Sequence, residues 1–297
     1  MKKQKRIFDA TFQDSCRLVT KKSVEIVGDE RGLKTMKFTN KITGSILALT
    51  FFPLGAWALN IGMAEGMLYT DGESINVISI ESAHAIGLIG TFIEPLSFLL
   101  LFLWFFVILV NLFPKNDYSS HYAWGTITLM VMMLLFSPAV FLLSAGFTID
   151  SFGWLGLILL SFFGLFWVIV VLKRSIDKVL NIIFLRKEEI NHSNNTNKVL
   201  KLFLLICLVV SVLNRFSLRL GFASANSSLL SWFYGWAILI FWGLLTVCIS
   251  IMIPRVVRSI YLMKYSEQYR VHFEVSKEKW YSKRKARRLQ KKRKNES

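Results

Sequence analysis

Apolar residues in this chain gather into six long stretches that polar segments separate. A helix needs about 20 apolar residues to cross roughly 30 Å of hydrocarbon, and most of the stretches exceed that length. Such lengths favour a lipid bilayer over a soluble core. The pattern therefore predicts an all-α integral membrane protein with six transmembrane helices. We expect these helices at residues 42–67, 85–113, 123–147, 152–172, 199–217 and 229–253.

Positive charge alternates between the polar segments, and this alternation predicts the orientation. Residues 1–41 hold 11 Lys and Arg, residues 173–198 hold six and residues 254–297 hold 15, whereas residues 68–84 hold none. Lys and Arg accumulate on the cytoplasmic side of a membrane. We therefore expect a multi-pass cell-membrane protein with both termini in the cytoplasm. It would consist of a head (1–41), a six-helix membrane domain (42–253) and a basic tail.

Composition agrees with a membrane protein and indicates no cofactor. Hydrophobic residues make up 54% of the chain, and it contains 25 Phe, more than soluble proteins of this size usually carry. Cys16, Cys207 and Cys248 are too far apart in sequence for a CxxC element. Glu188, Glu189 and His192 have a spacing compatible with metal ligation, but such a fragment is more typical of a solvated charge cluster. We predict no metal site and no cofactor.

Glu94 and Glu65 are the candidate residues of an intramembrane polar site. Two interpretations of Glu94 stay open. Glu94 and Pro95 can begin the second helix on the outer side, which leaves residues 82–94 as an interfacial approach, or Glu94 can line a polar cavity and handle protons or cations. Asp150 is expected in a turn that reaches water, and Arg215 is expected to extend from the end of a short span toward the interface.

Proline and glycine predict bent and closely packed helices. Pro53 and Pro138 would free the carbonyls of Leu49 and Leu134, which Thr50 and Ser137 stand near enough to satisfy. Small residues let membrane helices approach closely. The glycines at which we expect such contacts are Gly62, Gly66, Gly153, Gly156 and Gly164.

The head carries a weak pattern of its own. Phe8, Phe12, Cys16 and Val19 recur at helical spacing, which predicts a short amphipathic helix over residues 7–20. A hairpin is predicted across residues 24–38. We expect the head to lie on the membrane or on a partner.

The tail is the most distinctive polar segment, with ten cations and no acid within residues 279–294. Before this run, the last membrane helix is expected to continue past Pro254 with Val256, Ile260 and Met263 on one face. The run favours contact with anionic lipid headgroups, while a protein partner or nucleic-acid phosphate remains an alternative. The candidate contact residues are Lys283, Arg284, Lys285, Arg287, Arg288, Lys291, Lys292, Arg293 and Lys294.

Two classes of function fit these features. The chain lacks the GxxxxGK[ST], GxSxG and HxxxxD patterns, so we do not expect an enzyme. The first class is a membrane-embedded subunit of a multi-protein transport or secretion system, of exporter, secretion or conjugation-channel type, which works with membrane-protein partners and a separate ATPase. The alternative is a non-transporting scaffold or immunity-type protein that acts through the basic tail.

Overall fold

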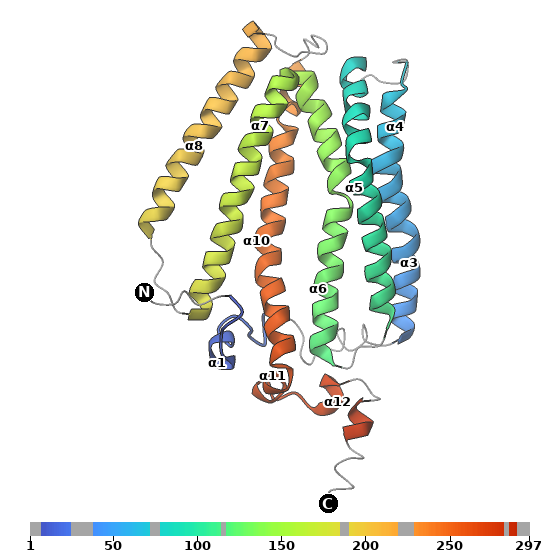
Figure 1. The fold of residues 1–297 in the computed structure, drawn as a ribbon, viewed down its shortest axis with the longest axis vertical. Helices are drawn as coiled ribbons and strands as arrows, with labels where there is room; N and C mark the ends of the chain where they lie inside the picture. The colour runs from blue at the N-terminus through green and yellow to red at the C-terminus, as the bar shows by residue number, and fades with distance from the viewer. Residues whose placement is uncertain are drawn as a thin grey trace, which may run out of the picture.

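The computed structural model consists of helices that run side by side along one direction (Figure 1). It describes residues 7–24, 38–71, 78–113, 117–184, 190–218, 229–281 and 285–289. Within these ranges the only β contact is an isolated antiparallel bridge between Asp117 and Tyr281. The predicted all-α class is confirmed for the part of the chain that the structure describes.

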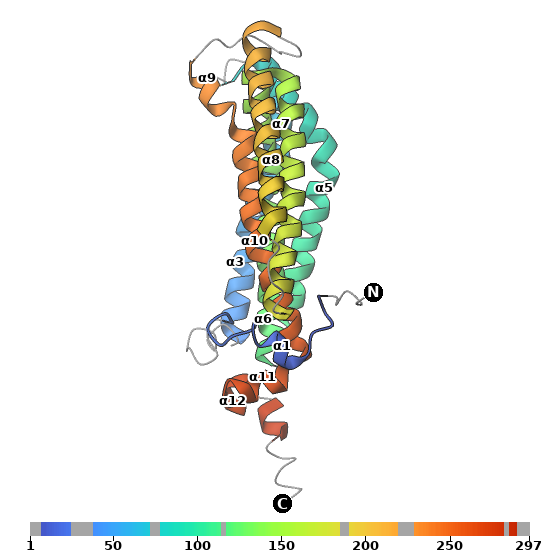
Figure 2. The same ribbon diagram turned by 90° about the vertical axis from the view of Figure 1, so that its left-hand side faces the viewer.

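The long helices are α3 (Phe38–Trp57), α5 (Ile80–Leu112), α6 (Tyr118–Leu135), α7 (Ser137–Phe184), α8 (Ile190–Leu213) and α10 (Ala237–Lys264). The short ones are α1 (Phe12–Ser15), the π-helix η1 (Ala58–Gly62), α4 (Met63–Leu68), the π-helix η2 (Asn214–Leu218), α9 (Leu229–Tyr234), α11 (Ser266–His272) and α12 (Lys277–Trp280). The elements α1, α11 and α12 lie at one end of the bundle and α9 lies at the other (Figure 2). We call these the terminal end and the far end.

Five stretches of the described residues are long and apolar enough to cross a membrane. They are Lys41–Leu68, Ile80–Leu112, Tyr118–Phe184, Lys198–Leu218 and Ser231–Lys264. Large apolar side chains project from their outer surfaces, and Phe92, for example, is 79% exposed. An apolar exterior of this kind suits lipid rather than water. The structure therefore supports a multi-pass membrane protein.

The stretch Tyr118–Phe184 reverses direction near its middle. A straight helix of 67 residues would be about 100 Å long. Gly153 instead has φ 69° and ψ −179°, a conformation that side chains with a Cβ rarely adopt. Figure 1 shows α7 turning back at the far end and returning toward the terminal end. Glycine at this position allows the reversal.

Close packing between helices depends on glycines, although not on all of those predicted. A Cβ on Gly164 would lie 2.1 Å from the Trp242 ring, so this glycine lets α7 and α10 approach, as expected. A Cβ on Gly66 would meet nothing within 4 Å, and one on Gly62 would meet only the carbonyl of Trp57. The prediction that Gly62 and Gly66 form a contact between helices is wrong.

The predicted proline bends differ in how their carbonyls are satisfied. Ser137 donates from Oγ to the carbonyl of Leu134 at 2.8 Å, as predicted, at the break between α6 and α7. Thr50 donates instead to Ile46 at 2.9 Å, one turn back in its own helix. The predicted contact of Thr50 with the Leu49 carbonyl is wrong, because a helical threonine reaches the carbonyl four residues earlier.

Candidate functional site

Glu94 lies near the middle of a continuous helix. α5 begins after Ser79, which accepts a hydrogen bond from the backbone of Ser82, and it continues through Pro95 to Leu112. The interpretation that Glu94 and Pro95 begin the helix is therefore wrong. At 1.5 Å per residue, Glu94 lies about 21 Å from the first residue of α5 and about 27 Å from the last. This position is the middle of the bundle.

The π-helix η1 lies at the same depth as Glu94. A Cβ on Gly90 would lie 2.3 Å from the Cβ of Ala64, and Trp104 donates from its indole nitrogen to the carbonyl of Ala48 at 2.9 Å. These two contacts between antiparallel segments place Glu94 opposite residues 58–62. π-Helices are rare, and those that occur are often found at functional sites.

Asn60, within η1, bridges the break between α6 and α7. Its Nδ2 donates to the carbonyl of Leu135 at 2.8 Å, and its Oδ1 accepts from the backbone N–H of Ala139 at 2.9 Å. The side-chain amide thus takes the place of the helical hydrogen bond between these two residues. Asn60 is 1% exposed and fully engaged. Irregular backbone in three helical segments therefore meets at one depth.

The two predicted acidic residues differ from Asn60. Glu94 is half-buried and Glu65 is exposed, and no hydrogen bond or ion pair joins either carboxylate to the described residues. Glu65 directly follows Ala64, which packs on Gly90, so it lies about one turn nearer the far end than Glu94. The role of these carboxylates as an intramembrane polar site stays a prediction.

A buried polar cluster at the far end was not predicted. Asp150 is 1% exposed and accepts hydrogen bonds from the backbone N–H of Ser79 at 2.9 Å and from the hydroxyl of Tyr234 at 2.8 Å. The expectation that Asp150 reaches water is wrong. The reversal at Gly153 turns Asp150 inward, against the start of α5 and the end of α9. Two charge-assisted hydrogen bonds then hold its carboxylate.

Arg215 joins the same cluster from η2. Its guanidinium donates to the carbonyl of Ser151 at 2.8 Å and to Oγ of Ser231 at 2.9 Å, and the neighbouring Asn214 donates to the carbonyl of Phe152 at 2.8 Å. The expectation that Arg215 extends from the span end toward the interface is wrong. It binds the polar backbone that the reversal exposes. We call the set Ser79, Asp150, Ser151, Asn214, Arg215, Ser231 and Tyr234 the far-end cluster.

At the terminal end, the head packs against the C-terminal helices. Tyr265 donates from its hydroxyl to the carbonyl of Ala10 at 2.8 Å, and the hydroxyl of Tyr269 shares a hydrogen bond of 2.6 Å with Ser15. Phe12 lies edge-on against Tyr269 with ring centroids 4.9 Å apart. We call residues 7–24, the end of α10, α11 and α12 the terminal cap, and the adjoining residues Asp117, Tyr281 and Lys285 form its rim.

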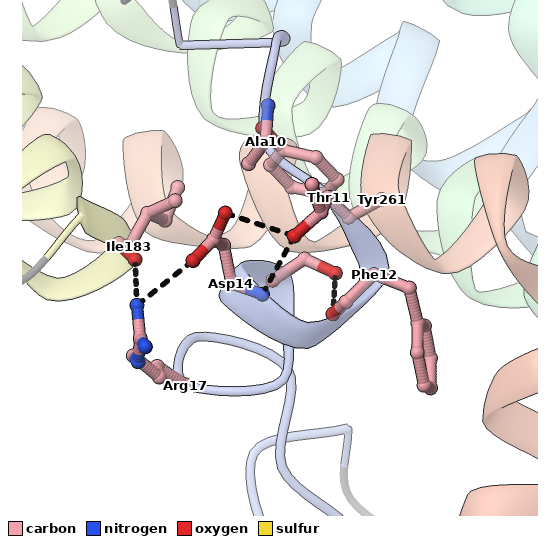
Figure 3. Close-up of polar contacts among 8 residues, drawn as sticks. Ala10, Thr11, Phe12, Asp14, Arg17, Ile183 and Tyr261 are labelled. Carbon is pink, nitrogen blue, oxygen red and sulfur yellow. Dashed lines mark hydrogen bonds and ion pairs between the residues drawn. The ribbon is translucent and has the colours of Figure 1, made fainter.

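The head also contacts α7. Figure 3 shows the Arg17 guanidinium between the Asp14 carboxylate and the carbonyl of Ile183, at 3.0 and 2.7 Å. Tyr261 accepts from the backbone N–H of Ala10 at 3.3 Å and donates to the carbonyl of Ile7. One short segment thus links the ends of α7 and α10.

These contacts correct the predictions for the head. The only α-helix in residues 7–24 is Phe12–Ser15, because the segment packs along the tyrosines of the C-terminal helices. Phe8 is 48% exposed while Val19 is fully buried, so the predicted apolar face does not form. The described head packs against the C-terminal helices of its own chain, and its contact with a membrane or a partner stays a prediction. The predicted hairpin falls almost entirely outside the described residues.

The C-terminal segment closes the terminal cap. α10 continues past Pro254 to Lys264, as predicted, and beyond Pro254 it buries Val257, Ser259, Tyr261 and Leu262. Val256, Ile260 and Met263 lie on one face of this continuous helix, as their spacing predicts, and Met263 is 47% exposed. The turn that follows α10 directs the chain back across the end of the bundle, so the inner side of the last turns of α10 contacts the head. Contact with the head therefore determines which face of the helix end is buried.

The basic tail is held at its start. Lys285 lies 3.6 Å from the Asp117 carboxylate and 4.4 Å from the centre of the Tyr281 ring. Arg287 and Arg288 are exposed. The other candidate lipid contacts, Lys283, Arg284, Lys291, Lys292, Arg293 and Lys294, lie outside the described residues. The structure thus leaves two of the three described candidates open to solvent or headgroups.

Several groups in the terminal cap have shifted pKa values. Partial burial alone would raise the pKa of Asp117, but hydrogen bonds from Ser120 and Ser119 and the charge of Lys285 hold it below its ordinary value. The hydrogen bond from Arg270 lowers the pKa of Glu267. Burial and the neighbouring Glu267 raise the pKa of Tyr281 to about 12. The Tyr281 hydroxyl is therefore neutral and donates to the Glu267 carboxylate.

The cap also contains an open pocket of about 270 Å³ between the head and α11. Cys16, Lys21, His272 and Glu274 are among its lining residues. Burial raises the pKa of the Cys16 thiol, which makes it a poor nucleophile. No group of three or more potential metal ligands occurs within the described ranges. The segment with Glu188 and Glu189 lies outside them.

The fold and these sites define a multi-pass, all-α membrane protein with polar groups at its middle and at both ends. Comparison with protein-family models, curated proteins and solved structures gave no match.

Proposed function

We propose that the chain is a membrane-embedded subunit of a multi-protein translocation system, of exporter, secretion or conjugation-channel type. The two arms of Tyr118–Phe184 each cross the cell membrane, which gives six spans with the four other candidate stretches. Both chain ends are cytoplasmic. This orientation is supported by the 11 cations of residues 1–41 and the 15 cations of residues 254–297, whose described parts meet in the terminal cap.

The observation that carries this proposal is the mid-depth carboxylate of Glu94. A charge in the hydrocarbon region costs several kcal/mol, and acidic residues that persist there usually belong to substrate pathways, proton relays or partner contacts. Glu94 lies beside η1 and next to Pro95, where the helices deviate from ideal geometry. Such irregular backbone at membrane depth is tolerated where it lines a polar route or meets protein.

Energy for translocation must come from another subunit. The sequence contains no GxxxxGK[ST] loop to bind a nucleotide. We therefore propose a separate ATPase as a partner, with no enzymatic activity in this chain. The exposed Arg287 and Arg288, next to the cap, are placed to contact that partner or anionic lipid headgroups.

Copurification and a functional assay together test the proposal. The protein, solubilised gently from native membranes, is expected to retain an ATPase, and cells that carry Glu94→Gln are expected to lose substrate movement while insertion is unchanged. Glu81→Gln, at an exposed glutamate in the first turn of the same helix, serves as the matched control. Normal substrate movement after deletion of the gene would rule out the translocation role.

A scaffold or immunity-type protein is the second candidate, and the terminal cap favours it. The described head and the C-terminal helices pack together there, and the exposed Arg287 and Arg288 beside them are placed to contact a partner. Deletion of residues 283–294 is expected to weaken flotation with anionic liposomes while membrane insertion is preserved. Loss of a membrane complex on that deletion, with substrate movement intact, would favour the scaffold. Unchanged flotation would remove the lipid-binding role of the tail.

A further inference from the structure

Two hydrogen-bond acceptors lie close together on the surface of α5 at mid-depth. Glu94 is half-buried there and has no partner among the described residues. Pro95 has no N–H, so the carbonyl of Thr91 lacks its helical donor. The Thr91 hydroxyl, which is exposed, donates to Leu88 at 2.7 Å and does not reach that carbonyl. The Glu94 carboxylate and the Thr91 carbonyl, which lacks its usual helical donor, therefore lie one turn apart, and both are hydrogen-bond acceptors.

The surroundings of this patch supply no donor. Phe92 is 79% exposed and Phe98 is 52% exposed, so the neighbouring surface is aromatic and apolar. Lipid chains also offer no hydrogen-bond donor. Unsatisfied acceptors of this kind are rarely left without a partner in native proteins.

No cation of the described residues forms an ion pair with Glu94. Lys41 is the first residue of its membrane stretch, and Arg215 belongs to the far-end cluster. Lys198 and Lys201 lie on α8, which is at the opposite edge of the bundle from α5 (Figure 1). The described part of the chain therefore supplies no cation to pair with Glu94 at mid-depth.

We infer that the patch formed by Thr91, Glu94 and Pro95 binds a transmembrane helix of a partner subunit that carries a Lys or Arg side chain at the same depth. A guanidinium or ammonium group offers several donors, which can satisfy the carboxylate and the carbonyl together. Charge complementarity selects a basic partner rather than a second copy of this chain, which would bring two carboxylates together. The inference rests on the proposed function only in that both require partner subunits.

Photocrosslinking in native membranes tests the inference. A photoreactive amino acid at Phe98, which lies one turn from Glu94 on the same side of α5, is expected to crosslink to one membrane protein. The same probe at Phe162, 64% exposed on α7, is the control for surface exposure. Glu94→Gln, which keeps the shape of the side chain, is expected to reduce the Phe98 crosslink about tenfold or more, because a buried charge pair is lost.

The identity of the crosslinked segment decides the outcome. Peptide mapping is expected to find an apolar segment of about 20 residues with Lys or Arg in its middle third. Glu94→Lys should abolish the crosslink, and replacing the partner's cation with Glu should restore it. The inference is overturned if no crosslink forms, if Glu94→Gln leaves it unchanged, if it joins two copies of this chain, or if the mapped segment has no cation.

This result is independent of the test for translocation. A crosslink that depends on Glu94, together with normal substrate movement after gene deletion, would uphold the partner helix and reject the proposed function. Loss of substrate movement in Glu94→Gln with an unchanged crosslink would support the proposed function and reject the partner helix.

Discussion

The two ends of the bundle are closed by different chemistry. The far-end cluster holds a charged group inside: Asp150 is 1% exposed and hydrogen-bonded on both of its oxygens. The terminal cap buries neutral groups inside, with Tyr261 and Tyr269 fully covered. Its ion pairs lie at the rim, where the Lys285 side chain is 38% exposed.

This difference predicts how each end responds to substitution. Removing one member of a buried charged network leaves its partners unsatisfied in a low-dielectric environment, so a single change there is costly. The cap distributes its stability over several neutral hydrogen bonds and aromatic contacts, each of which contributes about 1 kcal/mol. We therefore expect the far end to be sensitive and the terminal end to be tolerant.

The largest effect is expected for Asp150→Ala. The backbone N–H of Ser79 and the hydroxyl of Tyr234 would both lose their acceptor inside the protein. We expect the free energy of unfolding in mild detergent to fall by about 3 kcal/mol. Asp177→Ala, an exposed aspartate on the same helix, is the matched control and should change it by less than about 0.5 kcal/mol. Equal effects of the two substitutions would contradict the difference between the ends.

A second test adds volume instead of removing charge. A Cβ on Gly235 would lie 2.3 Å from the Cβ of Ser151 and 2.8 Å from the Phe152 ring, so Gly235→Ala must push the reversal away from α9. We expect a loss of about 2 kcal/mol in the free energy of unfolding. Gly125→Ala is the control, because its Cβ would meet nothing within 4 Å. A neutral result for Gly235→Ala would show that the far end can relax.

The limits of the membrane stretches are easier to predict from sequence than the local structure within them. The predicted stretch 42–67 corresponds to Lys41–Leu68 and the predicted 199–217 to Lys198–Leu218, because apolar length alone sets such limits. The helix around Glu94 was mispredicted because a proline commonly starts a helix but is also tolerated inside one in a membrane. Its continuation to Ile80 depends on contacts with α4 through Gly87 and Gly90.

The polar sites were harder to predict than the helices. Asp150 and Arg215 are 65 positions apart, and only the reversal at Gly153 brings them into one cluster. The sequence did contain a signal: a polar Asp-Ser pair just before a glycine, between two apolar stretches that are too close for a long loop. The terminal cap had a weaker signal, because Tyr261, Tyr265 and Tyr269 recur every four residues after the last span.

A smaller effect is expected at the terminal end for Tyr269→Phe. The substitution removes the hydroxyl that bonds to Ser15 and keeps the ring that packs on Phe12. We expect a loss of about 1 kcal/mol in the free energy of unfolding. Labelling of Cys16, which lies next to Ser15, should become faster as the head separates more often. Tyr69→Phe is the control at an 82% exposed tyrosine. A loss as large as that of Asp150→Ala would mean that the cap is not tolerant.

The smallest effect is a pH dependence at the rim of the cap. The pKa of Asp117 in the folded protein lies below its ordinary value of 3.8, so the folded state favours the ionised carboxylate. The stabilisation is therefore complete well above pH 3.8 and is lost as the pH falls through 3.8 toward the lower folded pKa. Asp117→Asn keeps the hydrogen-bonding shape but not the charge. We expect wild type and Asp117→Asn to differ in thermal unfolding midpoint at pH 6 and to converge on acidification, whereas Asp177→Asn should show no such convergence. A difference that stays constant down to pH 3 would place the stability of this rim in hydrogen bonding rather than in the pairing of Asp117 with Lys285.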